Sequence, residues 1–134
     1  MRYMLDTNIC IYVIKQTPAA VLRKFRQHEA EGLGVSAVTA AELAFGVAKS
    51  GSRRNQAALQ EFLSALEVAP FDDEAARIYG DVRSDLESRG IPIGPLDTQI
   101  AAHALSLEVT LVSNNLREFE RATGLRCANW AQEA

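Results

Sequence analysis

The chain has 134 residues, of which 48% are hydrophobic and 23% are charged, and its formal net charge is −3. This length predicts a single folded domain over residues 1–134, and the composition excludes a disordered chain, while the negative charge argues against a non-specific nucleic-acid binder. No apolar run approaches the ~20 residues that cross a bilayer, and Asp6 interrupts any signal peptide, so we expect a cytoplasmic protein without a membrane anchor.

The first half of the chain alternates between strand and helix patterns. Residues 2–6 form a short apolar run that ends on an acid, which predicts a strand. Residues 33–36, after the break at Gly32, predict a second strand. Amphipathic or alanine-rich stretches predict four helices, at residues 8–16, 19–31, 39–50 and 53–66.

The second half continues this alternation. Residues 68–70 are at best a short strand, whereas the β-branched run 109–113 is the clearest strand pattern in the chain, and a last strand is expected near residues 125–127. Three further helices are predicted, at residues 72–88, 97–107 and 117–122, the second of them opened by Pro95.

Strands that alternate with helices in this way predict an α/β fold. The expected architecture has three layers, α/β/α, with a central parallel sheet covered by helices on both faces. In such sheets, functional groups gather at the carboxyl ends of the strands. The positions of the acidic residues relative to the strands are therefore informative.

Three acidic residues stand next to predicted strand ends. Asp6 ends the first strand, Glu42 lies in the first turn of the helix after the second strand, and Asp97 begins the helix before the strand at 109–113. Each also has a structural explanation. Asp6 and Asp97 could each cap a helix, and Thr39 with Glu42 fits a capping box.

If the sheet is parallel, the three carboxylates would converge on one edge. Two carboxylates ~5 Å apart repel by about 3 kcal/mol at an effective dielectric of 20. A fold tolerates such a cluster by protonating it or by binding a cation, and hard oxygen ligands select Mg²⁺ or Mn²⁺. With only two histidines and two cysteines, widely spaced, the chain does not offer a zinc site, and His103 is expected to be a core or interface residue.

Several segments in the same order resemble the PIN-domain family, and within it the VapC toxins of bacterial toxin–antitoxin pairs. These segments cover nearly the whole chain and are residues 5–8 (LDTN), 38–46 (VTAAELAFG), 95–104 (PLDTQIAAHA), 111–120 (LVSNNLREFE) and 129–130 (NW).

The resemblance implies a PIN-like fold and an endoribonuclease that depends on Mg²⁺ or Mn²⁺. Asp6, Glu42 and Asp97 would be its catalytic acids, and Asp6 and Asp97 would bind the metal ion. Further polar side chains would orient these acids through hydrogen bonds. They are Thr7, Asn8 and Ser113.

The chain departs from the family pattern at one point. Many family members carry a further acid after the last main strand, where this chain has Asn114 and Asn115. Asn115 can offer only a carbonyl oxygen, so Glu118 is the candidate for a fourth ligand or an orienting residue, with Phe119 turned inward as its anchor. The alternative for Glu118 is a solvated residue paired with Arg121.

The resemblance also implies partners. These are an RNA substrate, a VapB-type antitoxin that blocks the acidic centre, and a second toxin chain in a homodimer. Similarity to the enteric VapC toxins points to initiator transfer RNA as the substrate. An antitoxin groove would be formed by apolar residues that otherwise belong to an ordinary core, namely Ala44, Val47, Leu59, Phe62 and Leu63.

Three other classes of protein share parts of this pattern. A haloacid-dehalogenase-like phosphatase needs a second acid two residues after the first, but Asn8 stands there. A receiver domain needs a lysine after a late strand, where residues 113–115 supply none. A catalytically inactive PIN-like binding module remains the third alternative.

Overall fold

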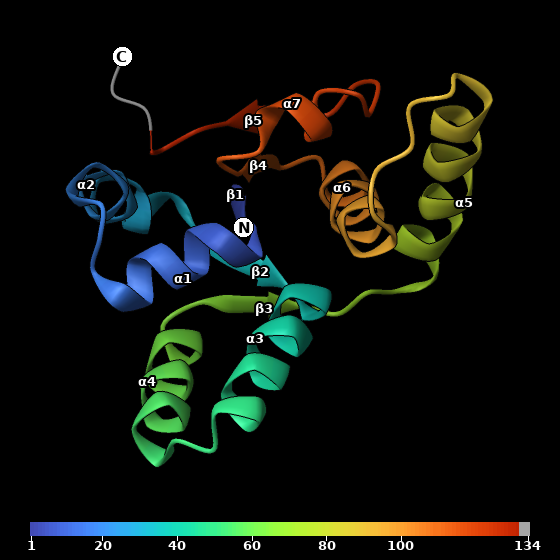
Figure 1. Cartoon of the computed structure of the whole chain (residues 1–134). Coiled ribbons are helices and arrows are strands. Elements are labelled where there is room, and N and C mark those ends of the chain that lie inside the picture. Colours follow the sequence, from blue (N-terminus) through green and yellow to red (C-terminus); the bar gives the residue numbers. More distant parts are fainter. Residues whose placement is uncertain (132–134) are drawn as a thin grey trace.

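The computed structural model describes residues 1–131 and contains one five-stranded sheet (Figure 1). The strands lie in the order β3-β2-β1-β4-β5, and every neighbouring pair is parallel, which confirms the predicted parallel α/β sheet. The strands are β1 (Tyr3–Leu5), β2 (Leu33–Ser36), β3 (Glu67–Ala69), β4 (Thr110–Val112) and β5 (Cys127–Ala128).

Helices cover both faces of this sheet. In Figure 1, α1 and α2 lie on one side and α6 on the other, with α5 packed against α6, while α3 and α4 project as a pair at the bottom. The α-helices are α1 (Thr7–Lys15), α2 (Ala19–His28), α3 (Ala37–Ser50), α4 (Arg53–Ser64), α5 (Asp73–Ser88), α6 (Pro95–Leu107) and α7 (Leu116–Phe119). A 3₁₀ turn, η1 (Glu29–Glu31), follows α2. None of the helices within residues 1–131 is long and apolar enough to span a membrane.

The hydrophobic core is split into two clusters by the sheet. Because successive side chains of a strand point to opposite faces, Leu5 and Val112 join a cluster with residues of α1, α2 and α4, whereas Met4 and Leu111 join a cluster with residues of α6 and α7. All four of these strand residues are fully buried. The sheet is therefore covered on both faces, as the three-layer prediction requires.

The strand order brings three polar residues to one edge of the sheet. Asp6 follows β1, Ser36 ends β2 and Ser113 follows β4, and β1 pairs with both β2 and β4. The register pairs Leu5 with Val112, and the backbone N–H of Asp6 donates to the carbonyl of Val112 over 3.0 Å. Parallel pairing thus places the carboxyl ends of all three strands side by side.

Two predicted helix starts were wrong by two residues each. Helix α3 begins at Ala37 rather than Thr39, because the side chain of Ser36 accepts a hydrogen bond from the backbone N–H of Val38 and acts as the N-cap. Helix α6 begins at Pro95, with Gly94 as its N-cap, so Asp97 lies inside the first turn. Neither a capping box at Thr39 nor a cap role for Asp97 is therefore present.

Candidate active site

Asp6 is the most buried acidic side chain of the site. It is 5% exposed, and its Oδ1 accepts a 2.9 Å hydrogen bond from the backbone N–H of Ile9, so it caps helix α1. Burial is the largest effect on this carboxyl and raises its pKa to about 6. Hydrogen bonds from Ser113 and Ile9 lower the pKa, and the charges of Asp97 and Glu42 raise it.

Asp97 lies half-buried at the start of α6. Burial raises the pKa of its carboxyl, and the negative charges of Glu118 and Glu42 raise it further, in that order of effect. Asp6, Glu42 and Asp97 therefore lie close enough to repel one another, although they come from three separate elements. The predicted convergence of acids at this edge is what the fold produces.

Glu42 points from α3 toward the start of α1. Its Oε1 accepts a 2.8 Å hydrogen bond from the hydroxyl of Thr7, the residue directly after Asp6. Thr39, expected to share a capping box with Glu42, instead lies within the helix and is fully buried. The Glu42 carboxylate therefore links α3 to the α1 end of the site.

Glu118 is the fourth acid that the fold brings to this place. It comes from the short helix α7, next to the buried Phe119, and it is the charge with the largest effect on the pKa of Asp97. Glu120 lies on the other side of that segment, where its charge contributes to the raised pKa of Cys127. Of the two glutamates, Glu118 is the one beside Asp97.

The remaining polar candidates occupy different places. Ser113 is fully buried beside Asp6, and its Oγ also accepts a 2.9 Å hydrogen bond from the backbone N–H of Asn115. The side chain of Asn115 makes no capping hydrogen bond to α7, and the Asn114 amide donates to the Tyr12 hydroxyl over 2.7 Å. Asn8 is exposed on the first turn of α1.

The four acids carry uncompensated negative charge. Within residues 1–131, no lysine or arginine forms an ion pair with Asp6, Glu42, Asp97 or Glu118. Their carboxylate oxygens are the hard donors that Mg²⁺ and Mn²⁺ prefer, so the donor set fits such an ion. In the described part of the chain, however, no three acidic, histidine or cysteine side chains are arranged to hold an ion as they stand. Water and substrate oxygens would have to complete its coordination.

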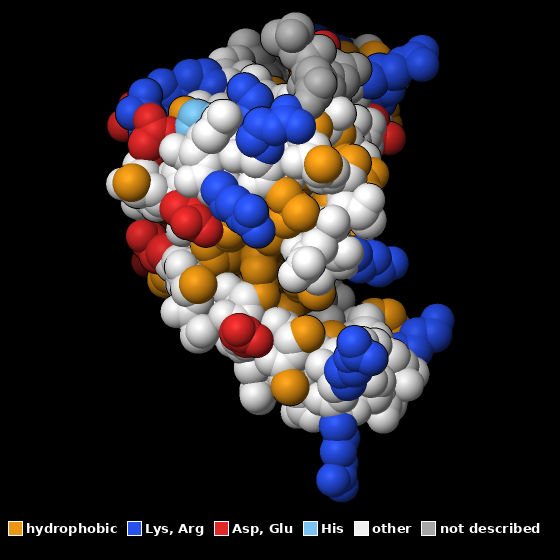
Figure 2. All heavy atoms as spheres, turned by 90° about the vertical axis from the view of Figure 1, so that its left-hand side faces the viewer, with side chains coloured by type: hydrophobic (Ala, Val, Ile, Leu, Met, Phe, Trp, Pro, Cys, Tyr) orange, Lys and Arg blue, Asp and Glu red, His pale blue; other side chains and the backbone are white. Residues whose placement is uncertain are grey.

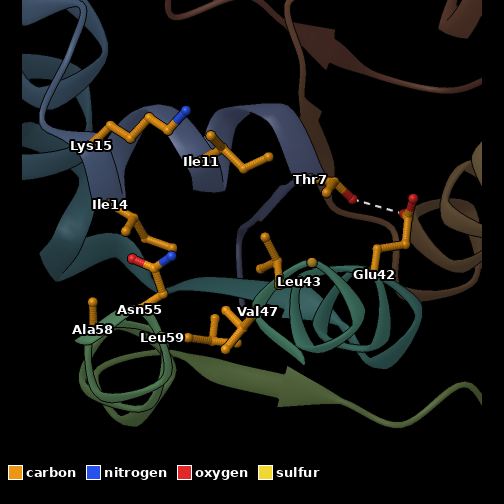
Figure 3. Close-up of a pocket in the computed structure, with 11 residues that line it drawn as sticks. Thr7, Ile11, Ile14, Lys15, Glu42, Leu43, Val47, Asn55, Ala58 and Leu59 are labelled. Atoms are coloured by element: carbon orange, nitrogen blue, oxygen red, sulfur yellow. Dashed lines mark hydrogen bonds between the residues drawn. The ribbon is translucent and has the colours of Figure 1, made fainter. Parts of the chain in front are cut away.

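A groove of about 290 Å³ leads away from the acids between α1, α3 and α4 (Figure 3). Glu42 and Thr7 lie at one end, Lys15 lies at the other, and the walls between are mostly aliphatic. Figure 2 shows the side of the molecule with α1, α2 and α4, where hydrophobic side chains line a hollow with Lys and Arg around it. We call the groove drawn in Figure 3 the α1–α3–α4 groove. Its apolar walls are Ile11, Ile14, Leu43, Val47 and Leu59.

The sequence interpretation missed one buried polar contact, which joins the end of β2 to α6. His103 is 1% exposed, and a 2.8 Å hydrogen bond joins its Nδ1 to the Oγ of Ser36. His103 was expected to be a core or interface residue, but its partner Ser36 lies 67 positions away in the sequence, and no local sequence pattern identifies that partner.

Comparisons with known proteins agree with this geometry. The family description "PIN domain" matches residues 3–125. Ribonuclease VapC2 of Haemophilus influenzae is 46% identical over 131 residues, which cover 97% of this chain and 98% of that protein. The tRNA(fMet)-specific endonuclease VapC of Shigella flexneri is 42% identical over 132 residues, which cover 98% of this chain and 99% of that protein. The VapBC2 structure from Rickettsia felis, bound to a promoter DNA fragment, has a TM-score of 0.89 at 39% identity and covers 97% of this chain and 99% of that one.

Proposed function

This chain belongs to the PIN-domain family, in its VapC branch, and from that premise we propose that it is a toxin endoribonuclease that cleaves RNA with a divalent metal ion. The observation that carries the proposal is the convergence of Asp6, Glu42, Asp97 and Glu118 without a basic partner in residues 1–131. Such a cluster is costly unless a cation balances it.

The proposed roles follow from where each acid lies. Asp6 and Asp97 would hold the ion, because Asp6 is buried, Asp97 is half-buried, and burial is the largest cause of the raised pKa of each carboxyl. When bound, Mg²⁺ or Mn²⁺ would activate water and stabilise charge on the phosphodiester. Ser113 holds the Asp6 carboxyl by a hydrogen bond, and Thr7 holds Glu42.

The proposed setting is a bacterial toxin–antitoxin module. The structural neighbours include VapBC structures from Rickettsia felis and Salmonella typhimurium, which support a VapB-type antitoxin for this chain. Within such a complex the toxin would be a homodimer. The Shigella flexneri relative is named for tRNA(fMet), which makes initiator transfer RNA the proposed substrate. The site of action would be the cytoplasm.

The experiment is an RNA-cleavage assay with purified protein freed of any partner. Cleavage should require Mg²⁺ or Mn²⁺, and Asp6→Asn and Asp97→Asn should each reduce its rate by about a hundredfold or more, because each removes a charged ligand. Asp81→Asn makes the same chemical change at an exposed position on α5 and should leave the rate unchanged. Full activity in EDTA, or in either site variant, would refute the proposal.

A further inference from the structure

We infer that the buried hydrogen bond between Ser36 and His103 is a positioning device that fixes α3, which carries Glu42, against α6, which carries Asp97. The inference rests on the proposed function, because it concerns the separation of two of the proposed catalytic acids. Neither Ser36 nor His103 would contact the metal ion or the RNA. Both are therefore positioning residues rather than catalytic ones.

Ser36 holds the start of α3 in place. It is the last residue of β2, is fully buried, and caps α3 by accepting a 3.1 Å hydrogen bond from the backbone N–H of Val38. The same Oγ atom makes the 2.8 Å bond to Nδ1 of His103. One hydroxyl group therefore ties together the end of β2, the start of α3 and the middle of α6.

The Nε2 side of the His103 ring is held mainly by packing. The backbone of Pro70 lies close enough to the ring to act on its pKa in the raising direction, while within residues 1–131 no hydrogen bond to Nε2 is formed. Phe71 packs edge-on against the ring, with the two ring centres 5.4 Å apart. Burial lowers the pKa of His103 and so favours the neutral ring, and the hydrogen bond to Ser36 is the polar contact that anchors it.

The Ser36–His103 contact can affect where the carboxylates of Glu42 and Asp97 lie. Glu42 lies less than two helical turns after Ser36, and Asp97 lies less than two turns before His103. In the described part of the chain, no other hydrogen bond joins β2 or α3 to α6. A shift of either rigid helix at the Ser36–His103 contact would therefore be carried to the carboxylate on that helix, and metal affinity depends on such alignment.

Two substitutions of His103 separate positioning from simple packing. The amide nitrogen of asparagine falls near the place of Nδ1, whereas that of glutamine falls near Nε2, so His103→Asn can keep the bond to Ser36 and His103→Gln cannot. Mn²⁺ binding without RNA would be measured by the electron paramagnetic resonance signal of free Mn²⁺, well below each variant's melting temperature. His103→Gln should raise the Mn²⁺ dissociation constant about tenfold, and His103→Asn should keep it within about twofold of wild type.

Further variants guard against a general loss of structure. Ser36→Gly removes the hydroxyl at a position where glycine still tolerates the N-cap conformation, and it should raise the dissociation constant as His103→Gln does. The double variant should bind no more weakly than either single variant, because both remove the same link. Ser106→Ala removes a hydroxyl that bonds within α6, to the carbonyl of His103 over 2.7 Å, and should leave Mn²⁺ binding unchanged.

The outcomes distinguish the two proposals. If wild type binds Mn²⁺ and both His103→Gln and Ser36→Gly bind it equally well, the positioning role is refuted and the proposed function stands. Equal weakening by His103→Asn and His103→Gln would also refute it, since the effect would then be one of packing. If wild type itself binds no Mn²⁺, the metal-dependent function fails, and the positioning role fails with it.

Discussion

Asp6 combines two roles that are often treated as alternatives. Its Oδ1 caps α1 through the backbone N–H of Ile9, and the same buried carboxyl lies near Asp97 and Glu42. The two oxygens of a carboxylate carry about four lone pairs, so the hydrogen bonds from Ile9 and Ser113 leave acceptor capacity for an ion. Asp6 can therefore be both a helix cap and a metal ligand. At Asp97 the helix begins two residues earlier, so the cap role is lost and only the proposed ligand role remains.

Glu118 is the candidate to replace the further acid that this chain lacks at Asn114 and Asn115. Its negative charge is the largest electrostatic effect on Asp97, and it lies on α7 next to the buried anchor Phe119. We expect Glu118→Gln to raise the Mg²⁺ concentration needed for half-maximal RNA cleavage, because one negative charge near the ion is lost. A metal titration of the cleavage rate measures this.

Glu120→Gln is the matched control for that titration. It makes the same change one residue beyond Phe119, at an exposed position whose charge acts on Cys127 rather than on the site. Its titration should overlay that of wild type. Identical titrations for wild type and Glu118→Gln would show that Glu118 takes no part in metal binding, and the site would then consist of three acids.

At the level of elements, the pair α3–α4 shows what an amphipathic pattern can and cannot predict. The pattern identified Leu59, Phe62 and Val47 as apolar positions that face inward or line a groove. Leu59 does both, since it is 7% exposed and also lines the α1–α3–α4 groove. Phe62 instead packs against Phe25 of α2, with ring centres 6.3 Å apart. Helical periodicity identifies the apolar face of a helix, but not which neighbouring element packs against that face.

Gly46 offers a direct test of the groove as the antitoxin site. It lines the groove in the middle of α3, and a Cβ built there meets no atom within 4 Å. Gly46→Gln should therefore stabilise the fold by about 0.5–1 kcal/mol through helix propensity, while its side chain fills part of the groove. We expect binding of the cognate antitoxin, measured by calorimetry, to weaken by at least about tenfold.

Gly80 supplies the control for this substitution. It lies in α5, is exposed, and likewise has nothing within 4 Å of a built Cβ, but it is not part of the groove. Gly80→Gln should give a similar rise in melting temperature with unchanged antitoxin affinity. Equal affinities for the Gly46 and Gly80 variants would place the antitoxin elsewhere on the molecule.

For the molecule as a whole, the sequence was sufficient for the fold class but not for the strand order. Alternating strand and helix patterns predicted the parallel sheet, and the resemblance supplied the acids that converge on its edge. The order β3-β2-β1-β4-β5 depends on which strands pair, and that is decided by contacts between distant segments. The start of α3 was misplaced for a local reason, because Ser36 both ends β2 and caps α3, so that the helix begins directly after the strand.

We propose that this fold builds one divalent-metal site from Asp6, which follows β1, and Asp97, in the first turn of α6. Crystals of the protein soaked in Mn²⁺ test this most directly, because anomalous scattering locates the ion independently of the protein atoms. We predict one strong anomalous peak in contact with both carboxylates, and no peak there in Asp97→Asn crystals. A wild-type map without a peak between Asp6 and Asp97, at a Mn²⁺ concentration that supports full RNA cleavage, would contradict it.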